Sequence, residues 1–162
     1  MKTIRLLSLA FLIASISAAG AKDDGFLGRW VLDKGQPSGV APGSLETRIK
    51  QDGSGVTMES TFKEPDNGIV PLLYLGVMTT RMHLSLDGSA QQNQIGPFQM
   101  ASKTRLNGNQ MDTEWTAVVK DNQVQGHWTH TLSDDAKHMT LEISQSATQG
   151  QTAHATLHFV RK

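Results

Sequence analysis

The fold of this chain is decided by the stretch FQMASKTRLNGNQMDTEWTAVVKDNQVQGHWTHTLSDDAKHMTLEI, residues 98–143. Along four segments of this stretch, every second residue is apolar or small, and the residues between them are mostly polar. Such alternation is typical of β-strands with one buried face and one face in water. We therefore predict four antiparallel strands here, with these residues inward: Phe98, Met100, Ser102, Thr104 and Leu106; Met111, Thr113, Trp115, Ala117 and Val119; Val124, Gly126, Trp128, His130 and Leu132; Met139, Leu141 and Ile143.

The register between these strands follows from three short turns. We predict two-residue turns at 108–109 and 121–122 and a four-residue turn at 134–137, because Asn, Asp and Gly tolerate the positive φ of tight hairpin turns. A slip of one residue would send an inward set of side chains outward. The predicted cross-strand pairs are Ser102 with Trp115, Trp115 with Trp128, Ala117 with Gly126, Thr113 with His130, and Trp128 with Ile143.

The rest of the chain predicts more strands of the same kind. Alternating segments occur near residues 26–32, 45–50, 56–62, 82–86, 89–95 and 153–159. Eight to ten short strands joined mostly by tight turns predict an all-β fold, an antiparallel up-and-down barrel that closes on itself and leaves no edge. The two longest connections, 33–44 and 64–78, fall at the same end of such a barrel, which we expect to be its mouth.

The start of the chain predicts an export signal. A basic beginning with Lys2 and Arg5 is followed by the apolar run 6–16 and by small residues at Ala19 and Ala21. This pattern indicates a signal peptide, residues 1–21, cut after Ala21, because the run is too short to span a membrane. Residues 22–162 would then form a single domain located in the periplasm or secreted.

Composition limits the partners of the mature chain. Without the two basic residues of the signal, 13 Lys and Arg remain against 15 Asp and Glu, a net charge of −2. This balance gives no basis for nucleic acid as a partner. The chain contains no Cys, so neither disulfides nor a lipid-modified cysteine are expected.

A family resemblance rests on the motif Gly28-Arg29-Trp30, the β-meander after it and Arg161 at the end of the last strand. Together these features resemble the calycin superfamily, in particular small secreted bacterial lipocalin-like proteins. The resemblance implies that Gly28 and Trp30 lie at the closed end of the barrel and that Arg161 packs across the Trp30 ring, a contact worth roughly 0.5–2 kcal/mol. It also implies a small apolar ligand, as in many members. The chain departs from the lipocalin pattern in lacking disulfides and an obvious C-terminal helix.

The predicted interior offers little for catalysis. Its inward positions contain no Asp, Glu, Lys or Arg, and their only titratable residue is His130. Acid–base chemistry needs a carboxylate or a base held by a second group, so we expect no enzyme activity and no cofactor. His130 shares a layer with Thr104 and Thr113 in the predicted register. Either it anchors the polar group of a ligand, or it is a buried neutral histidine satisfied by threonine.

The same strands predict a pocket for a small hydrophobic molecule. Trp115 opposite Trp128 would form an aromatic wall, and adaptable Met side chains around it suit an apolar ligand of variable shape. The alternative is that these residues fill a solid core, as in small barrels. The candidate ligand-binding residues are Met58, Tyr74, Met82, Met100, Trp115, Ala117, Gly126, Trp128 and His130.

One loop is unusually apolar. Residues 69–78, IVPLLYLGVM, lie in a predicted connection, although loops usually lie in water. An exposed apolar patch marks a contact surface, so the segment is a lid that includes Tyr74, a buried strand, or a surface for a protein partner or a second copy.

Histidines on the outside do not predict a metal site. Exposed histidines without a nearby carboxylate or cysteine make a poor site, and we expect none at His83, His127, His138, His154 and His158. The leading hypothesis is therefore a secreted or periplasmic lipocalin-like barrel that binds a small apolar ligand. The alternative is a filled barrel that acts as an interaction or structural module through residues 69–78.

Overall fold

The computed structural model describes residues 23–35, 38–39, 42–63, 79–119, 121–148 and 150–162. These residues form a short 3-10 helix, η1 (Asp23–Gly25), and eleven strands. The strands are β1 (Gly28–Leu32), β2 (Ser38–Gly39), β3 (Ser44–Asp52), β4 (Gly55–Lys63), β5 (Thr79–Ser85), β6 (Asp87–Ile95), β7 (Phe98–Asn107), β8 (Gln110–Val119), β9 (Asn122–Leu132), β10 (His138–Ala147) and β11 (Thr152–Arg161).

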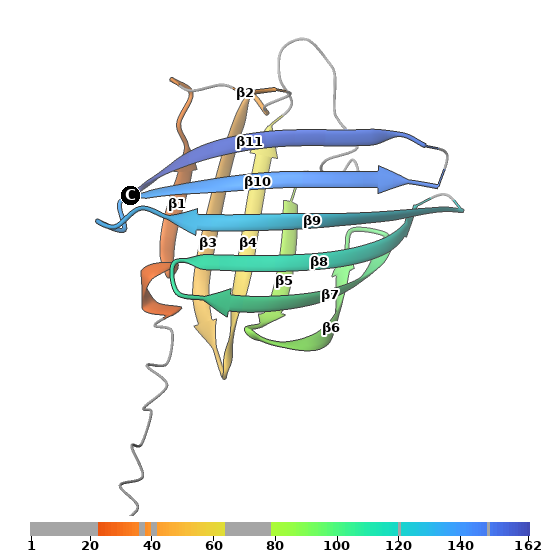
Figure 1. The fold of residues 1–162 in the computed structure, drawn as a ribbon, viewed down its shortest axis with the longest axis horizontal. Helices are drawn as coiled ribbons and strands as arrows, with labels where there is room; N and C mark the ends of the chain where they lie inside the picture. The colour runs from red at the N-terminus through yellow and green to blue at the C-terminus, as the bar shows by residue number, and fades with distance from the viewer. Residues whose placement is uncertain (1–22, 36–37, 40–41, 64–78, 120, 149) are drawn as a thin grey trace, which may run out of the picture.

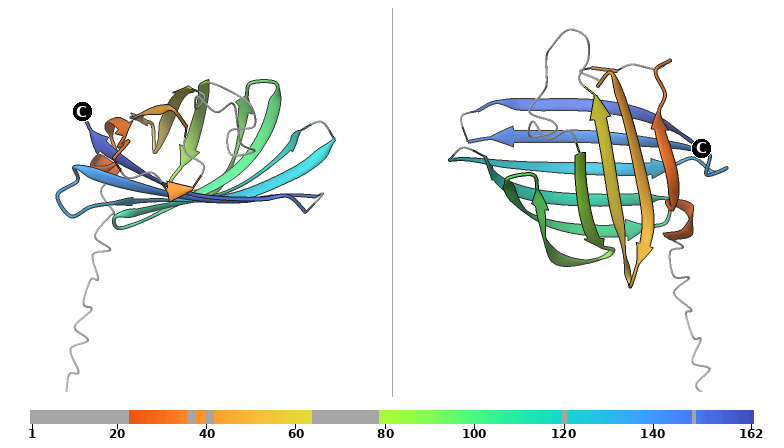
Figure 2. Two further views of the ribbon diagram at one scale, coloured as in Figure 1. Left: turned by 90° about the horizontal axis from the view of Figure 1, so that it is seen from above. Right: turned by 180° about the vertical axis from the view of Figure 1, so that it is seen from behind.

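The strands form one antiparallel sheet that curls into a flattened barrel. Their order is β5-β4-β3-β1-β11-β10-β9-β8-β7-β6, and the two-residue β2 pairs with β11. Strands β7 to β11 cross one side of the barrel, and β1, β3, β4 and β5 run behind them at a steep angle (Figure 1 and Figure 2). The first and last strands meet antiparallel, with Trp30 opposite Arg161. The predicted all-β up-and-down barrel is confirmed.

A side chain links the two edges of this sheet. Strands β5 and β6 stand at opposite ends of the strand order. The Asn93 amide oxygen accepts a hydrogen bond from the His83 backbone N–H (2.7 Å), and its nitrogen donates to the His83 carbonyl (3.1 Å). The same nitrogen donates to the Ser102 hydroxyl at 3.2 Å. Near the turn, the Ser89 hydroxyl also donates to the Ser85 hydroxyl at 2.8 Å. At this seam, side chains therefore join the strands in place of the continuous backbone ladder expected of a barrel without edges.

The N-terminal segment closes one end of the barrel. Trp30 is fully buried, and its indole N–H donates to the Phe26 carbonyl at 2.8 Å. The Arg161 guanidinium lies 4.7 Å from the centroid of the Trp30 ring and also donates to the Gly25 carbonyl. Gly28 has a φ of 132°, which residues with a Cβ rarely adopt. These contacts tie the first and last strands to η1.

Two of the three predicted registers are confirmed, and the third is wrong. Ser102 pairs with Trp115 across β7 and β8, and Trp128 pairs with Ile143 across β9 and β10. Between β8 and β9, however, Asn122 belongs to the strand and Asp121 occupies the turn with a φ of 66°. Asp and Asn both tolerate positive φ, so their neighbouring positions leave the turn ambiguous in the sequence.

The corrected turn moves the β8–β9 pairing by two residues. The observed pairs are Met111 with His130, Thr113 with Trp128, Trp115 with Gly126, and Ala117 with Val124. The predicted pairs of Trp115 with Trp128, Ala117 with Gly126, and Thr113 with His130 are wrong. Because side chains alternate with period two, an even shift keeps every inward residue inward.

Two sequence predictions lie outside the described residues: the signal peptide at 1–21 and the apolar segment 69–78. Both stay predictions. Within the described part of the chain, no helix has the length and apolar character that crossing a bilayer requires.

Candidate functional site

A cavity of about 70 Å³ lies between the inner faces of the strands. Its lining alternates along the strands with outward residues, as the sequence pattern predicts. The apolar lining consists of Leu45, Met58, Met82, Ile95, Met100, Trp128, Leu141 and Ile143, and the polar lining of Thr47, Ser60, Thr80 and His130. Among these described residues there is no Asp, Glu, Lys or Arg.

The cavity is small for a ligand site. Pockets for drug-sized ligands span about 300–1,000 Å³, whereas one water occupies about 30 Å³ of liquid. A ligand with a chain of carbon atoms must therefore displace part of the lining. Three methionines are suited to this, because the unbranched Met side chain has three rotatable bonds. Met58 and Met82 are direct cross-strand partners, and Met100 projects from β7.

A row of hydroxyl groups forms one side of the cavity. Thr47, Ser60 and Thr80 are cross-strand partners on β3, β4 and β5. The Thr47 and Ser60 hydroxyl oxygens are 2.9 Å apart and share a hydrogen bond. This side of the cavity is polar but carries no charge.

His130 is the one titratable residue of the cavity lining described. It is 2% exposed, and burial lowers its pKa to about 4, against the smaller opposing effects of a backbone hydrogen bond with Met111 and the charge of Asp112. The interaction with the Met111 backbone raises the pKa of His130 and so favours the protonated ring. The Met111 group involved must therefore be its carbonyl, which accepts a hydrogen bond from a ring N–H. The Nδ1 atom has no hydrogen-bond partner, and we therefore assign the ring N–H to Nε2, as the nitrogen that interacts with the Met111 backbone. At neutral pH, Nδ1 is thus a buried acceptor without a donor.

Neither Thr104 nor Thr113 forms a hydrogen bond with His130 Nδ1. Thr104 and Thr113 are cross-strand partners, and their hydroxyl oxygens are 2.9 Å apart in a buried hydrogen bond. The expectation that His130 is buried and neutral fits the structure, but its expected hydrogen bond with threonine is wrong. The two hydroxyls pair with each other because the β8–β9 register places Met111, and not Thr113, opposite His130.

Two tryptophans stand next to the cavity. The ring centroids of Trp115 and Trp128 are 5.3 Å apart with an interplanar angle of 48°, a tilted geometry favourable for aromatic pairs. Trp115 lies across Gly126, where a Cβ would come within 2.5 Å of the indole ring. The Nε1 atoms of both tryptophans are buried and have no hydrogen-bond partner. Buried donors of this kind are rare in folded proteins.

Gln145 adds two further buried polar atoms. It is 4% exposed, pairs with Gly126 across β9 and β10, and neither its Nε2 nor its Oε1 has a partner. We name Trp115, Trp128, His130 and Gln145 the inner β8–β10 wall. Five of the six buried unpartnered polar atoms in the described part of the chain belong to this wall, and the sixth is Arg161 Nε.

The cavity brings together five of the predicted ligand-binding residues, Met58, Met82, Met100, Trp128 and His130. Trp115 and Gly126 lie beside it, and Ala117 is buried opposite Met100 without lining it. Tyr74 lies outside the described residues.

Sequence reasoning missed other residues of this region. Gln145 lies two residues beyond Ile143 on β10 and continues its inward alternation. This alternation could have predicted that Gln145 faces inward. Thr47 and Thr80 stand at inward positions of β3 and β5 but carry no motif. Asn93 gave no signal at all, because its role depends on β5 and β6 standing at opposite ends of the strand order, which the sequence does not show.

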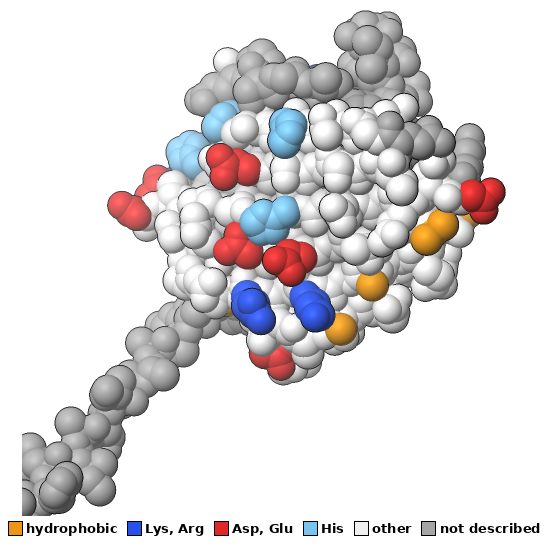
Figure 3. Space-filling model, turned by 45° about the vertical axis from the view of Figure 1, so that its right-hand side comes forward, with side chains coloured by type: hydrophobic (Ala, Val, Ile, Leu, Met, Phe, Trp, Pro, Cys, Tyr) orange, Lys and Arg blue, Asp and Glu red, His pale blue; other side chains and the backbone are white. Residues whose placement is uncertain are grey.

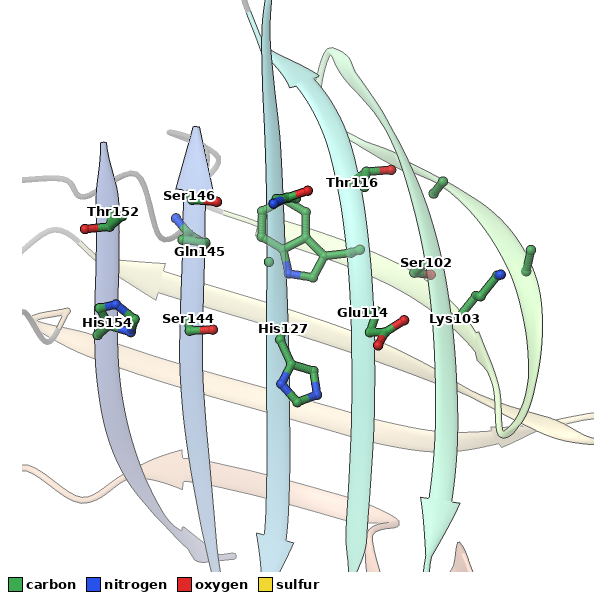
Figure 4. Close-up of a pocket in the computed structure, with 15 residues that line it drawn as sticks. Ser102, Lys103, Glu114, Thr116, His127, Ser144, Gln145, Ser146, Thr152 and His154 are labelled. Carbon is green, nitrogen blue, oxygen red and sulfur yellow. The ribbon is translucent and has the colours of Figure 1, made fainter. Parts of the chain in front are cut away.

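A second hollow, of about 610 Å³, lies on the outer face of β7 to β11 (Figure 4). Its lining includes a cross-strand row of Lys103, Glu114, His127, Ser144 and His154. Lys103 and Glu114 are direct neighbours of opposite charge in this row, so the hollow has no uniform electrostatic preference. Its lining also includes the buried residues Ser102, Trp115 and Gln145, as well as Gly126.

One face of the molecule shows no strong bias toward one kind of charge. Acidic, basic and histidine side chains mix on the face shown in Figure 3. Val118 is the one large hydrophobic residue of the described set that is exposed, at 59%. Within this set, no three His, Cys, Asp or Glu side chains are placed to hold a metal ion.

The antiparallel up-and-down barrel fold is shared by solved structures of known proteins. A REP1-NXSQ fatty acid transporter matches with a TM-score of 0.53 and 12% identity over 86% of this chain and 97% of its own. Fatty-acid-binding protein 1 of Echinococcus granulosus matches with a TM-score of 0.51 and 12% identity over 85% and 98% of the two chains. A secretory abundant heat soluble protein of Ramazzottius varieornatus has a TM-score of 0.51 and 13% identity over 85% and 96%.

Sequence comparison adds no relative. No family model matches the chain, and no curated protein matches it. At 12–13% identity, the structural matches show the fold alone. The calycin-like architecture expected from Trp30, Arg161 and the meander is confirmed.

Proposed function

We propose that this protein binds a small, largely apolar molecule inside its barrel and performs no catalysis. The observation that carries the proposal is an internal cavity among the described residues, lined by Met58, Met82, Met100 and Trp128 with few polar groups. Similar barrels support it, since two of them are a fatty acid transporter and a fatty-acid-binding protein. The predicted signal peptide supports a secreted or periplasmic location.

The methionine side chains give the proposal a physical route despite the small volume. Filling the cavity with a ligand requires these side chains to change rotamer, which costs less for Met than for branched residues. Burial of each ligand CH₂ group then contributes about 0.8 kcal/mol. Ligands of moderate chain length are therefore favoured over bulky ones.

The test is titration of the purified mature chain with apolar probes, read by native mass spectrometry. We expect one probe molecule per chain. Met82→Trp fills the cavity and should abolish uptake. Arg81→Trp adds the same side chain on the outward face of β5 and should leave uptake intact, because Arg81 is exposed and does not line the cavity.

The cavity volume of about 70 Å³ favours one alternative, a filled barrel that acts as an interaction or structural module. Under this alternative, the wild-type chain takes up no probe at any concentration. Equal uptake by the wild type and Met82→Trp would likewise reject the interior site. Leu73→Lys should then change oligomer size or partner capture without altering the fold.

A further inference from the structure

The strongest unexplained feature of the cavity is a pair of polar atoms on one strand. His130 and Trp128 are two residues apart on β9 and face inward together. His130 Nδ1 and Trp128 Nε1 are both buried, and neither has a hydrogen-bond partner. A buried polar atom without a partner costs about 1–3 kcal/mol in general, so two of them beside one cavity require an explanation.

The two atoms have complementary chemistry. The indole Nε1–H donates only. We assign the acceptor role to His130 Nδ1, because this buried atom has no partner and the ring N–H is assigned to the side of Met111. One ligand group that both accepts and donates would satisfy the pair.

The surroundings select against a charged group. The other polar lining residues, Thr47, Ser60 and Thr80, are neutral. The charge acting on His130 is that of Asp112, which projects from the outer face of β8. The Asp112 carboxylate accepts a hydrogen bond from the Thr129 hydroxyl, and its Oδ1 lies 3.6 Å from His127 Nε2. An anionic head group would therefore lose its hydration without gaining a cation.

We propose that the barrel selects amphipathic ligands whose polar end is an uncharged hydroxyl or carboxamide that donates to His130 Nδ1 and accepts from Trp128 Nε1–H. This inference rests on the proposed function, because it assigns the polar end of the ligand in the same cavity. The apolar tail of such a ligand would lie among the methionines.

The experiment compares four probes that are each built on a linear chain of eight carbon atoms, at neutral pH, by isothermal titration calorimetry. Octanol and octanamide can donate and accept, methyl octyl ether only accepts, and octanoate is an anion. We expect octanol and octanamide to bind about tenfold more tightly than the ether or octanoate, the effect of one net hydrogen bond.

Two variants locate the effect. His130→Leu should weaken octanol about tenfold and leave the ether unchanged. Trp128→Phe keeps an aromatic ring without the N–H, and it should weaken both octanol and the ether severalfold because both accept from the indole. His127→Leu, on the outward face of the same strand, is the matched control and should change no affinity.

The outcomes separate this inference from the function on which it rests. If octanoate binds as tightly as octanol, or if His130→Leu keeps the full preference for octanol over the ether, the head-group assignment is wrong although the barrel still binds ligands. If none of the four probes binds the wild type, both proposals fall. Should His130→Leu not fold, an unchanged octanol affinity in Trp128→Phe would be sufficient to overturn the assignment.

Discussion

The two regions around the tryptophans of this barrel differ in how their polar atoms are satisfied. At the closed end, the Trp30 N–H bonds to the Phe26 carbonyl, and Arg161 covers the ring and reaches the Gly25 carbonyl. Along the inner β8–β10 wall, the N–H groups of Trp115 and Trp128 have no partner, and neither do the polar atoms of His130 and Gln145. The unpartnered atoms of the wall are themselves buried, so contact with solvent does not explain the difference.

This comparison separates stability from binding. A region that only stabilises a fold should pair its buried polar atoms, because each unpaired one opposes folding. The closed end follows this rule except at Arg161 Nε, which is buried without a partner. The β8–β10 wall departs from it next to a cavity, and such departures concentrate at functional sites. We therefore assign the closed end to stability and the wall to ligand binding.

The largest expected effect tests this division by truncation. Trp30→Ala should lower the free energy of unfolding by about 3–5 kcal/mol, the usual cost of truncating a large aromatic residue in a packed core to alanine. Trp128→Ala should cost clearly less, because Trp128 is only partly buried and already borders a void. Urea unfolding of both variants measures the difference. Equal losses would remove the energetic distinction between the two regions.

The second prediction uses pH. The folded-state pKa of His130 is about 4, below its ordinary value of 6.5. Between pH 6.5 and pH 4, His130 is therefore protonated in the unfolded chain but neutral in the folded chain. Stability should therefore fall as pH decreases from 6.5 to 4, by about 3 kcal/mol in total from this residue. His130→Leu should flatten that part of the pH profile in urea unfolding. The outward His127→Gln should not, and an unchanged profile in His130→Leu would contradict the burial of a neutral ring.

The third prediction tests packing within the wall. Gly126→Ala places a Cβ within 2.5–2.7 Å of three Trp115 ring atoms, and such overpacking costs about 1–3 kcal/mol. In a Trp115→Phe background the smaller ring should absorb most of this cost. A double-mutant cycle measures the coupling, and additive losses would show that the two residues do not constrain each other.

The smallest effect concerns the cation at the closed end. Arg161→Gln removes the contact with the Trp30 ring and the charged hydrogen bond to the Gly25 carbonyl, and we expect a loss of about 1–2 kcal/mol. The neighbouring exposed Lys162→Gln should stay within about 0.5 kcal/mol of the wild type. A loss no larger for Arg161→Gln than for Lys162→Gln would show that the cation does not hold this end together.

The sequence predicted the fold better than the site. Strict alternation in β7 to β11 fixes which residues face inward, and that period survives an error of two residues in the β8–β9 turn. The residues that pair across β8 and β9 depend on the position of the turn, and Asp121 and Asn122 both tolerate the positive φ that the turn requires. The partners of His130 were therefore wrong although its burial was right.

Side-chain contacts between strands were beyond prediction for a different reason. Asn93 links β5 and β6 through the backbone of His83, and Thr47 bonds to Ser60 across the cavity wall. These residues have no local pattern that distinguishes them from other polar residues in strands. Whether a buried atom lacks a partner, as Gln145 Nε2 and Oε1 do, depends on packing in three dimensions.

The central claim is that ligands enter the barrel beside the β8–β10 wall and leave the closed end untouched. The chain has three tryptophans, so a nitrogen-15 correlation spectrum contains three indole N–H signals. On titration with octanol, we predict that the Trp128 signal moves most, that Trp115 follows through its contact with Trp128, and that Trp30 stays in place. A spectrum in which none of the three signals moves at saturating octanol, or in which Trp30 moves as far as Trp128, would contradict the account.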